Sequence, residues 1–113
     1  MYMAKQNNRG EIIMKETVTV YRFRDAFKQS DTYKNNFSYE GLYALFEYFE
    51  QLEDDICEEI ELDVVAICCD YTEYDNLNDF NDDYKYQYTR DELEDETIVI
   101  DIPDTERFII REF

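Results

Sequence analysis

Carboxylates are the most abundant reactive groups in this chain. Its 113 residues include 29 Asp and Glu against 11 Lys and Arg, which gives a formal net charge of −18. A catalytic acid or base needs a carboxyl group whose pKa is shifted by burial or by a second carboxylate beside it. The acidic residues here occur in clusters, and no position among them suggests a raised pKa. We therefore predict that the protein has no catalytic residues and is not an enzyme.

The other side chains that commonly carry out catalysis or bind metals are scarce. The chain has no His, which excludes Ser-His-Asp catalysis, Cys-His catalysis and His-ligated zinc. Cys57 is isolated, and the neighbouring Cys68 and Cys69 lie in an apolar run, where we interpret them as small core residues. Because there is no Cys-x-x-Cys spacing, we expect no zinc site and no cofactor.

One acidic segment contains part of a calcium-binding pattern. In the register that starts at Asp79, Asn81 and Asp83 fit a 12-residue calcium loop. Tyr84 stands where that loop needs Gly, and Arg90 stands where it needs a bidentate Glu. We therefore expect no metal site. A calcium-dependent module stays open as an alternative, which a calcium-induced rise in melting temperature would support.

The acidity is concentrated in one part of the chain. Residues 47–106 hold 23 acids against Lys85 and Arg90, a net charge of −21, whereas residues 1–46 carry a net charge of +2. Such a surface repels nucleic acids and anionic membranes, so we expect neither as a direct partner. The chain also has no secretion signal, no apolar run of ~20 residues and an odd number of Cys, which predicts a cytoplasmic protein.

The element best suited to present these acids is a long helix over 37–56. Ser38 is its predicted N-cap. Six apolar residues recur at spacings of three and four, which indicates one buried stripe: Leu42, Leu45, Phe46, Phe49, Leu52 and Ile56. Four acids project into another arc, roughly 80° wide: Glu40, Glu47, Glu50 and Asp54. The helix is therefore expected to bury one side and to expose carboxylates on another.

The remaining pattern predicts short strands and helices around this helix. We expect strands at 17–24 and 64–69, the second being central and buried, short helices at 76–84 and 90–95, and a C-terminal hairpin of 97–102 with 107–113. The predicted fold class is α+β. It consists of a small, mainly antiparallel sheet of about four strands with one long amphipathic helix packed on one face.

The N-terminal residues differ from the rest in being polar, slightly basic and without periodicity. We expect 1–13 to be a disordered leader and 14–113 to form a single α+β domain. Arg9, Gly10 and Glu11, shortly before Met14, can be encoded by a purine-rich sequence like a bacterial ribosome-binding site. Our hypothesis is that Met14 is the natural start, which mass spectrometry of the native protein would test.

The acidic surface itself suggests a binding function. Duplex DNA carries one negative charge per ~1.7 Å, so 18 charges match roughly 31 Å of DNA, close to the ~35 Å diameter of a compact domain. We hypothesise that the protein mimics DNA in the groove of a basic nucleic-acid-binding protein. The predicted partner-binding residues are exposed acids: Glu47, Glu50, Asp54, Asp55, Asp75, Asp79, Asp82 and Asp83. The predicted aromatic anchors are Tyr39, Tyr43, Tyr71, Tyr74, Tyr84, Tyr86 and Tyr88.

Three stretches carry a resemblance to known proteins: FSYEGLYALFEYFEQLEDD, EEIELDVVAICCDYTEY and TIVIDIPDTERFIIREF. Over roughly 14–113 the chain resembles a family of small, acidic, uncharacterised proteins of phages and mobile elements in low-GC Gram-positive bacteria. In character it is also similar to anti-CRISPR and antirestriction proteins that mimic DNA. The resemblance implies an inhibitor of a host defence nuclease, a CRISPR effector or restriction enzyme, in the bacterial cytoplasm. The alternative is a small structural or adaptor protein that binds another protein through a Tyr-rich surface, with acidity serving solubility.

Overall fold

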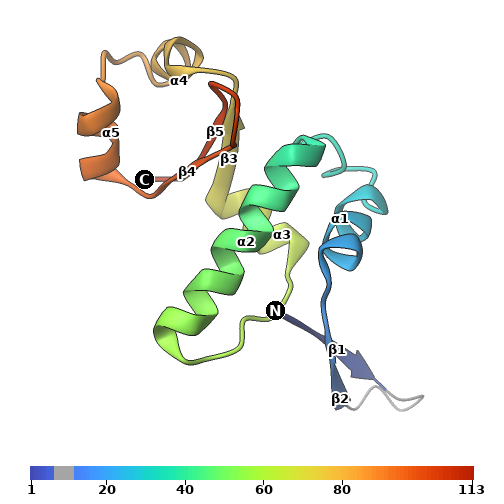
Figure 1. Cartoon of the computed structure of the whole chain (residues 1–113). Helices are drawn as coiled ribbons and strands as arrows, with labels where there is room; N and C mark the ends of the chain where they lie inside the picture. The colour runs from blue at the N-terminus through green and yellow to red at the C-terminus, as the bar shows by residue number, and fades with distance from the viewer. Residues whose placement is uncertain (7–11) are drawn as a thin grey trace.

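The computed structural model describes residues 1–6 and 12–113 of the chain. Within these residues the fold is α+β, as predicted, with five strands and five helices (Figure 1). The strands are β1 (Tyr2–Gln6), β2 (Ile12–Thr17), β3 (Tyr71–Tyr74), β4 (Val99–Asp101) and β5 (Phe108–Arg111). The helices are α1 (Val20–Lys28), α2 (Tyr39–Ile56), α3 (Val64–Asp70), α4 (Leu77–Tyr84) and α5 (Arg90–Glu96).

A three-stranded antiparallel sheet with the order β3-β5-β4 lies between two groups of helices. Side chains alternate between the two faces along a strand. Ile109 of the central strand β5 belongs to the core that contains the apolar face of α2. Its neighbours Phe108 and Ile110 pack instead with Phe80 of α4 and Leu93 of α5. The sheet therefore separates two cores, and its central strand is apolar on both faces because both faces are buried.

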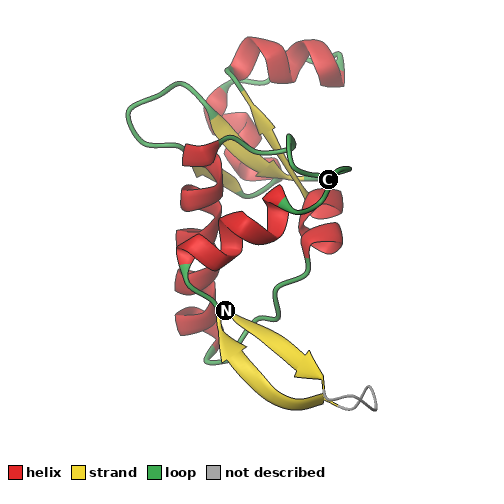
Figure 2. Cartoon of the chain, turned by 90° about the vertical axis from the view of Figure 1, so that its right-hand side faces the viewer, coloured by secondary structure: helices red, strands yellow, loops and turns green. Residues whose placement is uncertain are grey.

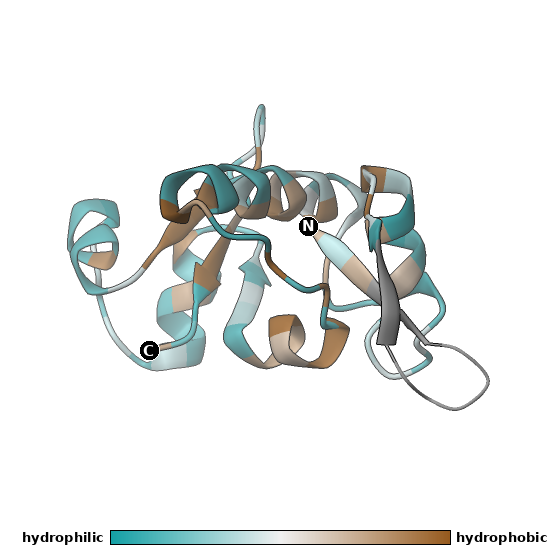
Figure 3. Ribbon diagram, turned by 90° about the horizontal axis from the view of Figure 1, so that it is seen from below, coloured by the Kyte–Doolittle hydropathy of each residue, from teal (hydrophilic) through white to brown (hydrophobic). Residues whose placement is uncertain are grey.

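The predicted sheet of about four strands, covered on one face by one long helix, is wrong in its details. The strands form a two-stranded and a three-stranded antiparallel sheet. Figure 2 shows β1 and β2 as a hairpin that projects from the rest of the molecule. Figure 3 shows hydrophobic residues on β4 and β5 of the larger sheet and hydrophilic residues along much of α2. Helices cover both faces of the larger sheet, and the side chains of β5 lie in a core on each face.

Several predicted elements are confirmed. α2 follows its predicted cap, whose Oγ accepts a hydrogen bond from the Gly41 N–H at 2.9 Å. The helices α4 and α5 lie where helical spacing places them, and β4 pairs with β5 as the predicted hairpin. Each of these elements has a local signal, a capping residue or turn chemistry, that agrees with its apolar spacing.

The predicted central strand at 64–69 is wrong, because this segment forms α3. The Asp63 carboxylate accepts a hydrogen bond from the Ala66 N–H at 3.1 Å and so caps a helix. Ile67 is buried while Val65 is exposed, whereas a central strand would have buried both sides. The β-branched composition favours a strand, but the cap and the burial of one side favour a helix.

The predicted strand at 17–24 is also wrong over most of its length. β2 ends at the start of this range and α1 begins three residues later. The Thr19 side chain accepts a hydrogen bond from the Arg22 N–H at 3.3 Å. Phe23 and Phe27, four residues apart, are both buried against α2 and its neighbours. The apolar residues thus have a helical spacing that the alternating pattern of residue types concealed.

Within the predicted leader, residues 2–6 form the strand β1, and the division into a leader and one domain stays a prediction. β1 pairs with β2 in the antiparallel sense. The Tyr2 N–H donates to the Ile60 carbonyl at 3.0 Å, and the Leu62 N–H donates to the Tyr2 carbonyl at 2.8 Å. These backbone hydrogen bonds on two sides give β1 its strand conformation. Residues 7–11 of the expected leader lie outside the described residues, and the start at Met14 stays a prediction.

Candidate protein-binding surface

The outward side of α2 presents a row of carboxylates. Glu40, Glu47 and Asp54 are exposed and Glu50 is half-buried. At 1.5 Å per residue, the row extends over about 21 Å of the helix. Asp55 is also exposed, beside the C-terminal end of the row. The four predicted partner-binding acids of α2 thus lie together on one rigid element.

Two tyrosines of α2 and one arginine of α1 lie beside this row. Tyr39 and Tyr43 are 58% and 42% exposed. Arg24 is buried, and its guanidinium carbon lies 3.5 Å from the centre of the Tyr39 ring and 5.6 Å from that of Tyr43. A hydrogen bond to Glu47 raises the pKa of the Tyr43 hydroxyl. These cation–π contacts hold two exposed rings in fixed positions next to the carboxylates.

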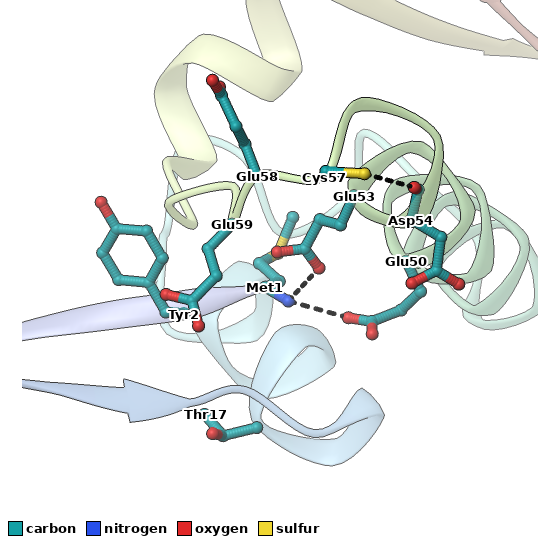
Figure 4. Close-up of a pocket in the computed structure, with 9 residues that line it drawn as sticks. All are labelled: Met1, Tyr2, Thr17, Glu50, Glu53, Asp54, Cys57, Glu58 and Glu59. Atoms are coloured by element: carbon teal, nitrogen blue, oxygen red, sulfur yellow. Dashed lines mark hydrogen bonds and ion pairs between the residues drawn. The ribbon is translucent and has the colours of Figure 1, made fainter.

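A hollow of about 450 Å³ opens at the C-terminal end of α2 (Figure 4). The carboxylates that line it are Glu50, Glu53, Asp54, Glu58 and Glu59. The Met1 ammonium group donates hydrogen bonds to Glu50, at 3.0 Å, and to Glu53. Figure 4 shows both carboxylates pointing toward this group, while Glu58 extends away from it. The hollow therefore holds one cation among five acids.

Glu53 is the best-buried acid of this hollow. Its side chain is 12% exposed, and its Oε2 accepts a hydrogen bond from the Ile60 N–H at 2.7 Å. Burial alone would raise the pKa of Glu53, but hydrogen bonds from Met1 and Ile60 outweigh it and lower the pKa. The ammonium group also offsets the unfavourable interaction of these acids with the C-terminal end of the helix dipole. Glu53 and, in part, Glu50 are thus occupied within the chain.

A second group of acids lies around α4. It contains the four remaining predicted residues: Asp75, Asp79, Asp82 and Asp83. Asp75 lies 3.5 Å from the Arg107 Nε, and Asp83 accepts a hydrogen bond from the Tyr74 hydroxyl at 2.6 Å. Burial and this hydrogen bond raise the pKa of Tyr74. Two members of the group therefore have partners within the chain, and all four are exposed.

The structure separates the two acidic groups. Figure 1 shows α4 at one end of the molecule, while α2 runs away from it, and Figure 2 gives the same arrangement. α4 packs on β3, whereas α2 packs on α1, β4 and β5. The eight predicted residues therefore do not form one patch. Only those on α2 form a continuous row.

The predicted aromatic anchors also fall into two groups, exposed rings and rings that pack in a core. Tyr39, Tyr43 and Tyr86 are exposed, but Tyr71 is buried in the larger core. The other three predicted anchors, Tyr74, Tyr84 and Tyr88, pack in the second core between the sheet, α4 and α5. Tyr71 is therefore wrong as an anchor because its ring completes the core, where it meets Phe49 with ring centres 5.5 Å apart.

Two residues of this surface were missed by sequence reasoning. Glu53 lies on the same side of α2 as Phe46 and Phe49, seven and four residues before it. A carboxylate within the apolar stripe of a helix needs a buried partner, so the position of Glu53 in the sequence predicts such a partner. For Arg24 the sequence offers no comparable signal, because its contacts with Tyr39 and Tyr43 join two elements that are distant in sequence.

The cysteines differ from the expectation of small core residues, whereas much of the calcium-like pattern lies in a helix, where a short helix was predicted. Cys57 and Cys69 are exposed and Cys68 is half-buried, so Cys69 is not a core residue. Its segment is a helix, which turns that side chain to solvent. Residues of the calcium-like pattern form α4, where the Asn81 carboxamide bonds the Tyr88 backbone. Among the described residues there is no cluster of acids, His and Cys arranged to hold a metal ion.

Comparisons with known proteins add no relationship to these observations. None of the helices in the described part of the chain combines the length and apolar character that a membrane span requires. Neither protein-family models, nor curated proteins, nor solved structures match the chain significantly.

Proposed function

We propose that the protein is a non-enzymatic inhibitor from a phage or another mobile element that binds a host defence nuclease at its nucleic-acid site. Its target is a basic nucleic-acid-binding protein, a CRISPR effector or a restriction enzyme, in the cytoplasm of a bacterial host. The observation that carries this proposal is the row of carboxylates on α2, which includes exposed Glu47 and Asp54 with Tyr43 between neighbouring acids.

The row suits a basic groove because its charges are held on a rigid helix. A protein that neutralises phosphates releases their counterions, and an acidic protein surface in the same groove gains from the same effect. α2 carries six acids and no base over 18 residues, about 27 Å, and five of them are accessible because Glu53 is paired within the chain. One strand of B-DNA carries about eight phosphates over that distance. The accessible acids of α2 therefore supply somewhat more than half of the charge of one DNA strand of the same length.

The whole molecule is a poorer match to duplex DNA than its net charge alone indicates. Its principal dimensions are 52 × 33 × 25 Å, so it is longer than the ~35 Å expected of a compact domain. A duplex 52 Å long carries about 31 charges, against 18 for this chain. The proposed mimicry therefore rests on α2 and the adjacent hollow, and not on the molecule as a whole.

A specific observation favours the second candidate function, an adaptor that binds a protein partner through a Tyr-rich surface. Tyr and Arg are enriched among the residues that contribute most binding energy at interfaces. Tyr39 and Tyr43, held by Arg24, have this composition and are exposed. In this alternative the carboxylates keep the protein dissolved and contribute little to the affinity.

A pull-down with competing DNA tests the proposal. The tagged chain is incubated with lysate of an AT-rich Gram-positive host that carries CRISPR and restriction systems, with and without an excess of duplex DNA. We expect a nuclease or its DNA-binding subunit to be captured and to be released by the duplex, because both ligands occupy one basic groove. Capture of a protein that is indifferent to DNA would support the adaptor and contradict the mimic.

A charge-matched variant controls for nonspecific attraction. Asp31→Lys combined with Asp95→Lys changes two exposed acids outside both acidic groups. Its net charge equals that of the pair Glu47→Lys and Asp54→Lys. Under the proposal, the control pair retains the nuclease and the α2 pair loses it.

A further inference from the structure

A smaller cavity lies between α2, the segment that follows it, and α3. It has a volume of about 170 Å³. Its apolar lining consists of Phe49, Ile60, Ala66, Ile67 and Tyr71. Three carboxyl-bearing residues also line it: Glu61, Asp63 and Asp70. All three acids are exposed, so the cavity combines an apolar interior with an acidic opening.

The walls of this cavity are fixed by contacts on every side. The Ile60 N–H donates to Glu53 at 2.7 Å, and the Ile60 carbonyl accepts from the Tyr2 N–H at 3.0 Å. The Ala66 N–H donates to Asp63 at 3.1 Å, which sets the start of α3. On the α2 side, the contact between the Phe49 and Tyr71 rings, whose centres are 5.5 Å apart, fixes the aromatic wall. A cavity that exists before binding spares a ligand the cost of ordering the site.

We propose that this cavity binds a long basic side chain, arginine or lysine, from the protein partner. Both side chains have an aliphatic stem that packs on apolar surface and a cationic head that reaches water or carboxylates. The stem would pack on Ile67 and the aromatic rings, and the head would meet Glu61 and Asp70. The inference rests on the proposed function, because it assumes a basic partner. It identifies one side chain by which that partner is anchored.

Other occupants suit the cavity less well. An anionic group would meet three carboxylates and the strong negative charge of the chain. A purely apolar side chain would fill the interior but would cover the carboxylates without a partner, which costs free energy. A basic side chain suits both parts of the lining, because its aliphatic stem packs on the apolar residues and its cationic head pairs with the carboxylates.

The proposal can be tested on the purified full chain without any partner. N-acetyl-arginine amide is titrated while the methyl signals of Ile60 and Ile67 are followed by NMR at constant ionic strength. N-acetyl-citrulline amide, of nearly the same shape but neutral, is the comparison ligand. We expect saturable shifts of both methyl groups with arginine and an affinity at least ten-fold lower with citrulline. Equal affinities, or shifts that do not saturate, would overturn the proposal.

Two pairs of variants locate the binding. Ala66→Leu adds bulk at a residue that lines the cavity, whereas Val65→Leu enlarges its neighbour on α3, which does not line it; both positions are exposed. We expect the first to lower the affinity for arginine at least ten-fold and the second to leave it unchanged. If Ala66→Leu binds as the unmodified chain does, the cavity is not the site.

The charge of the opening is tested in the same way. Glu61→Gln with Asp70→Asn is compared with Asp31→Asn and Asp95→Asn, which remove the same charge elsewhere. We expect at least a three-fold larger loss of affinity for the first pair, and equal losses would contradict the assignment. This assay contains no nuclease, so its failure leaves the pull-down result untouched, and failure of the pull-down leaves this result untouched.

Discussion

Glu73 joins the N-terminal end of α2 to the larger sheet. Its side chain is 6% exposed and pairs with Arg107. Its Oε1 accepts hydrogen bonds from the Ser38 N–H and hydroxyl, both at 3.0 Å. A Cβ added at Gly41 would lie 1.9 Å from this oxygen. Gly41 therefore leaves space that the carboxylate needs, although the position is inside a helix.

The first prediction concerns this contact. An exposed helix position gains about 1 kcal/mol when Gly is replaced by Ala. Gly41→Ala should instead lower the free energy of unfolding by about 1–3 kcal/mol, because the new methyl group displaces Glu73. Urea unfolding measures the change. In a Glu73→Ala background the same substitution should be neutral or stabilising, and a stabilising effect in the unmodified chain would contradict the contact.

The second prediction concerns the neighbouring cysteines of α3. Burial raises the pKa of Cys68 from 9.0 to about 11, whereas Cys69 is exposed. The thiolate is the reactive form, so a pKa two units higher leaves roughly 100-fold less of it at neutral pH. Iodoacetamide at pH 8 should alkylate Cys68 at least ten-fold more slowly than Cys69, and the difference should shrink as the pH approaches 11. Peptide mass spectrometry follows both sites, and equal rates at pH 8 would refute the prediction.

At the scale of elements, the end of α2 is strained. Cys57 follows the helix with φ at 56°, in the left-handed region that Gly adopts without cost. Its N–H and that of Glu58 both donate to the Glu53 carbonyl. This arrangement closes the helix in the usual way, but with a residue that has a Cβ.

The third prediction follows from this conformation. Cys57→Gly should raise the free energy of unfolding by about 1 kcal/mol, because Gly removes the steric cost of the left-handed conformation. Cys57→Ala is the matched control, since it removes the thiol and keeps the Cβ, and it should change stability by less than about 0.5 kcal/mol. Thermal or urea unfolding distinguishes the two, and an Ala variant as stable as the Gly variant would contradict the argument.

The elements also show how far the sequence determines the fold. α2 was predictable because Ser38 and the apolar spacing are local signals. The Thr89–Glu92 capping box at the start of α5 and Pro103 with Asp104 between β4 and β5 are local signals of the same kind. The run at 64–69 was not predictable, since its β-branched residues favour a strand and only tertiary packing shows that one side of it is buried. The carboxylate row on α2 was predictable for the same reason as α2 itself. The separation of α4 from that row depends on contacts distant in sequence, which periodicity does not report.

At the scale of the molecule, the two acidic groups make different predictions. Glu47 and Asp54 belong to the row on α2, whereas Asp79 and Asp82 lie on α4. We predict that Glu47→Lys with Asp54→Lys weakens binding of the captured nuclease at least 100-fold, because the row lies in its groove. The corresponding pair on α4, Asp79→Lys with Asp82→Lys, should weaken binding of the nuclease less than ten-fold. Circular dichroism must first show that each variant keeps its helix content.

Two results of this comparison would contradict the prediction. An α2 pair that binds as tightly as the unmodified chain would exclude the row as the contact surface. A loss of equal size in the pair on α4 would show that net charge, and not the arrangement on α2, governs the affinity.

The most direct test of the central claim is the salt dependence of this complex. If the five accessible acids of α2 replace phosphates, the affinity should fall roughly 500-fold between 50 and 200 mM salt, as phosphate contacts do. Titration of the captured nuclease with the chain at both concentrations, with duplex DNA as competitor, measures this. A fall of that size together with competition by DNA is the result we predict. An affinity that changes less than ten-fold, with no competition, would contradict DNA mimicry and favour the adaptor.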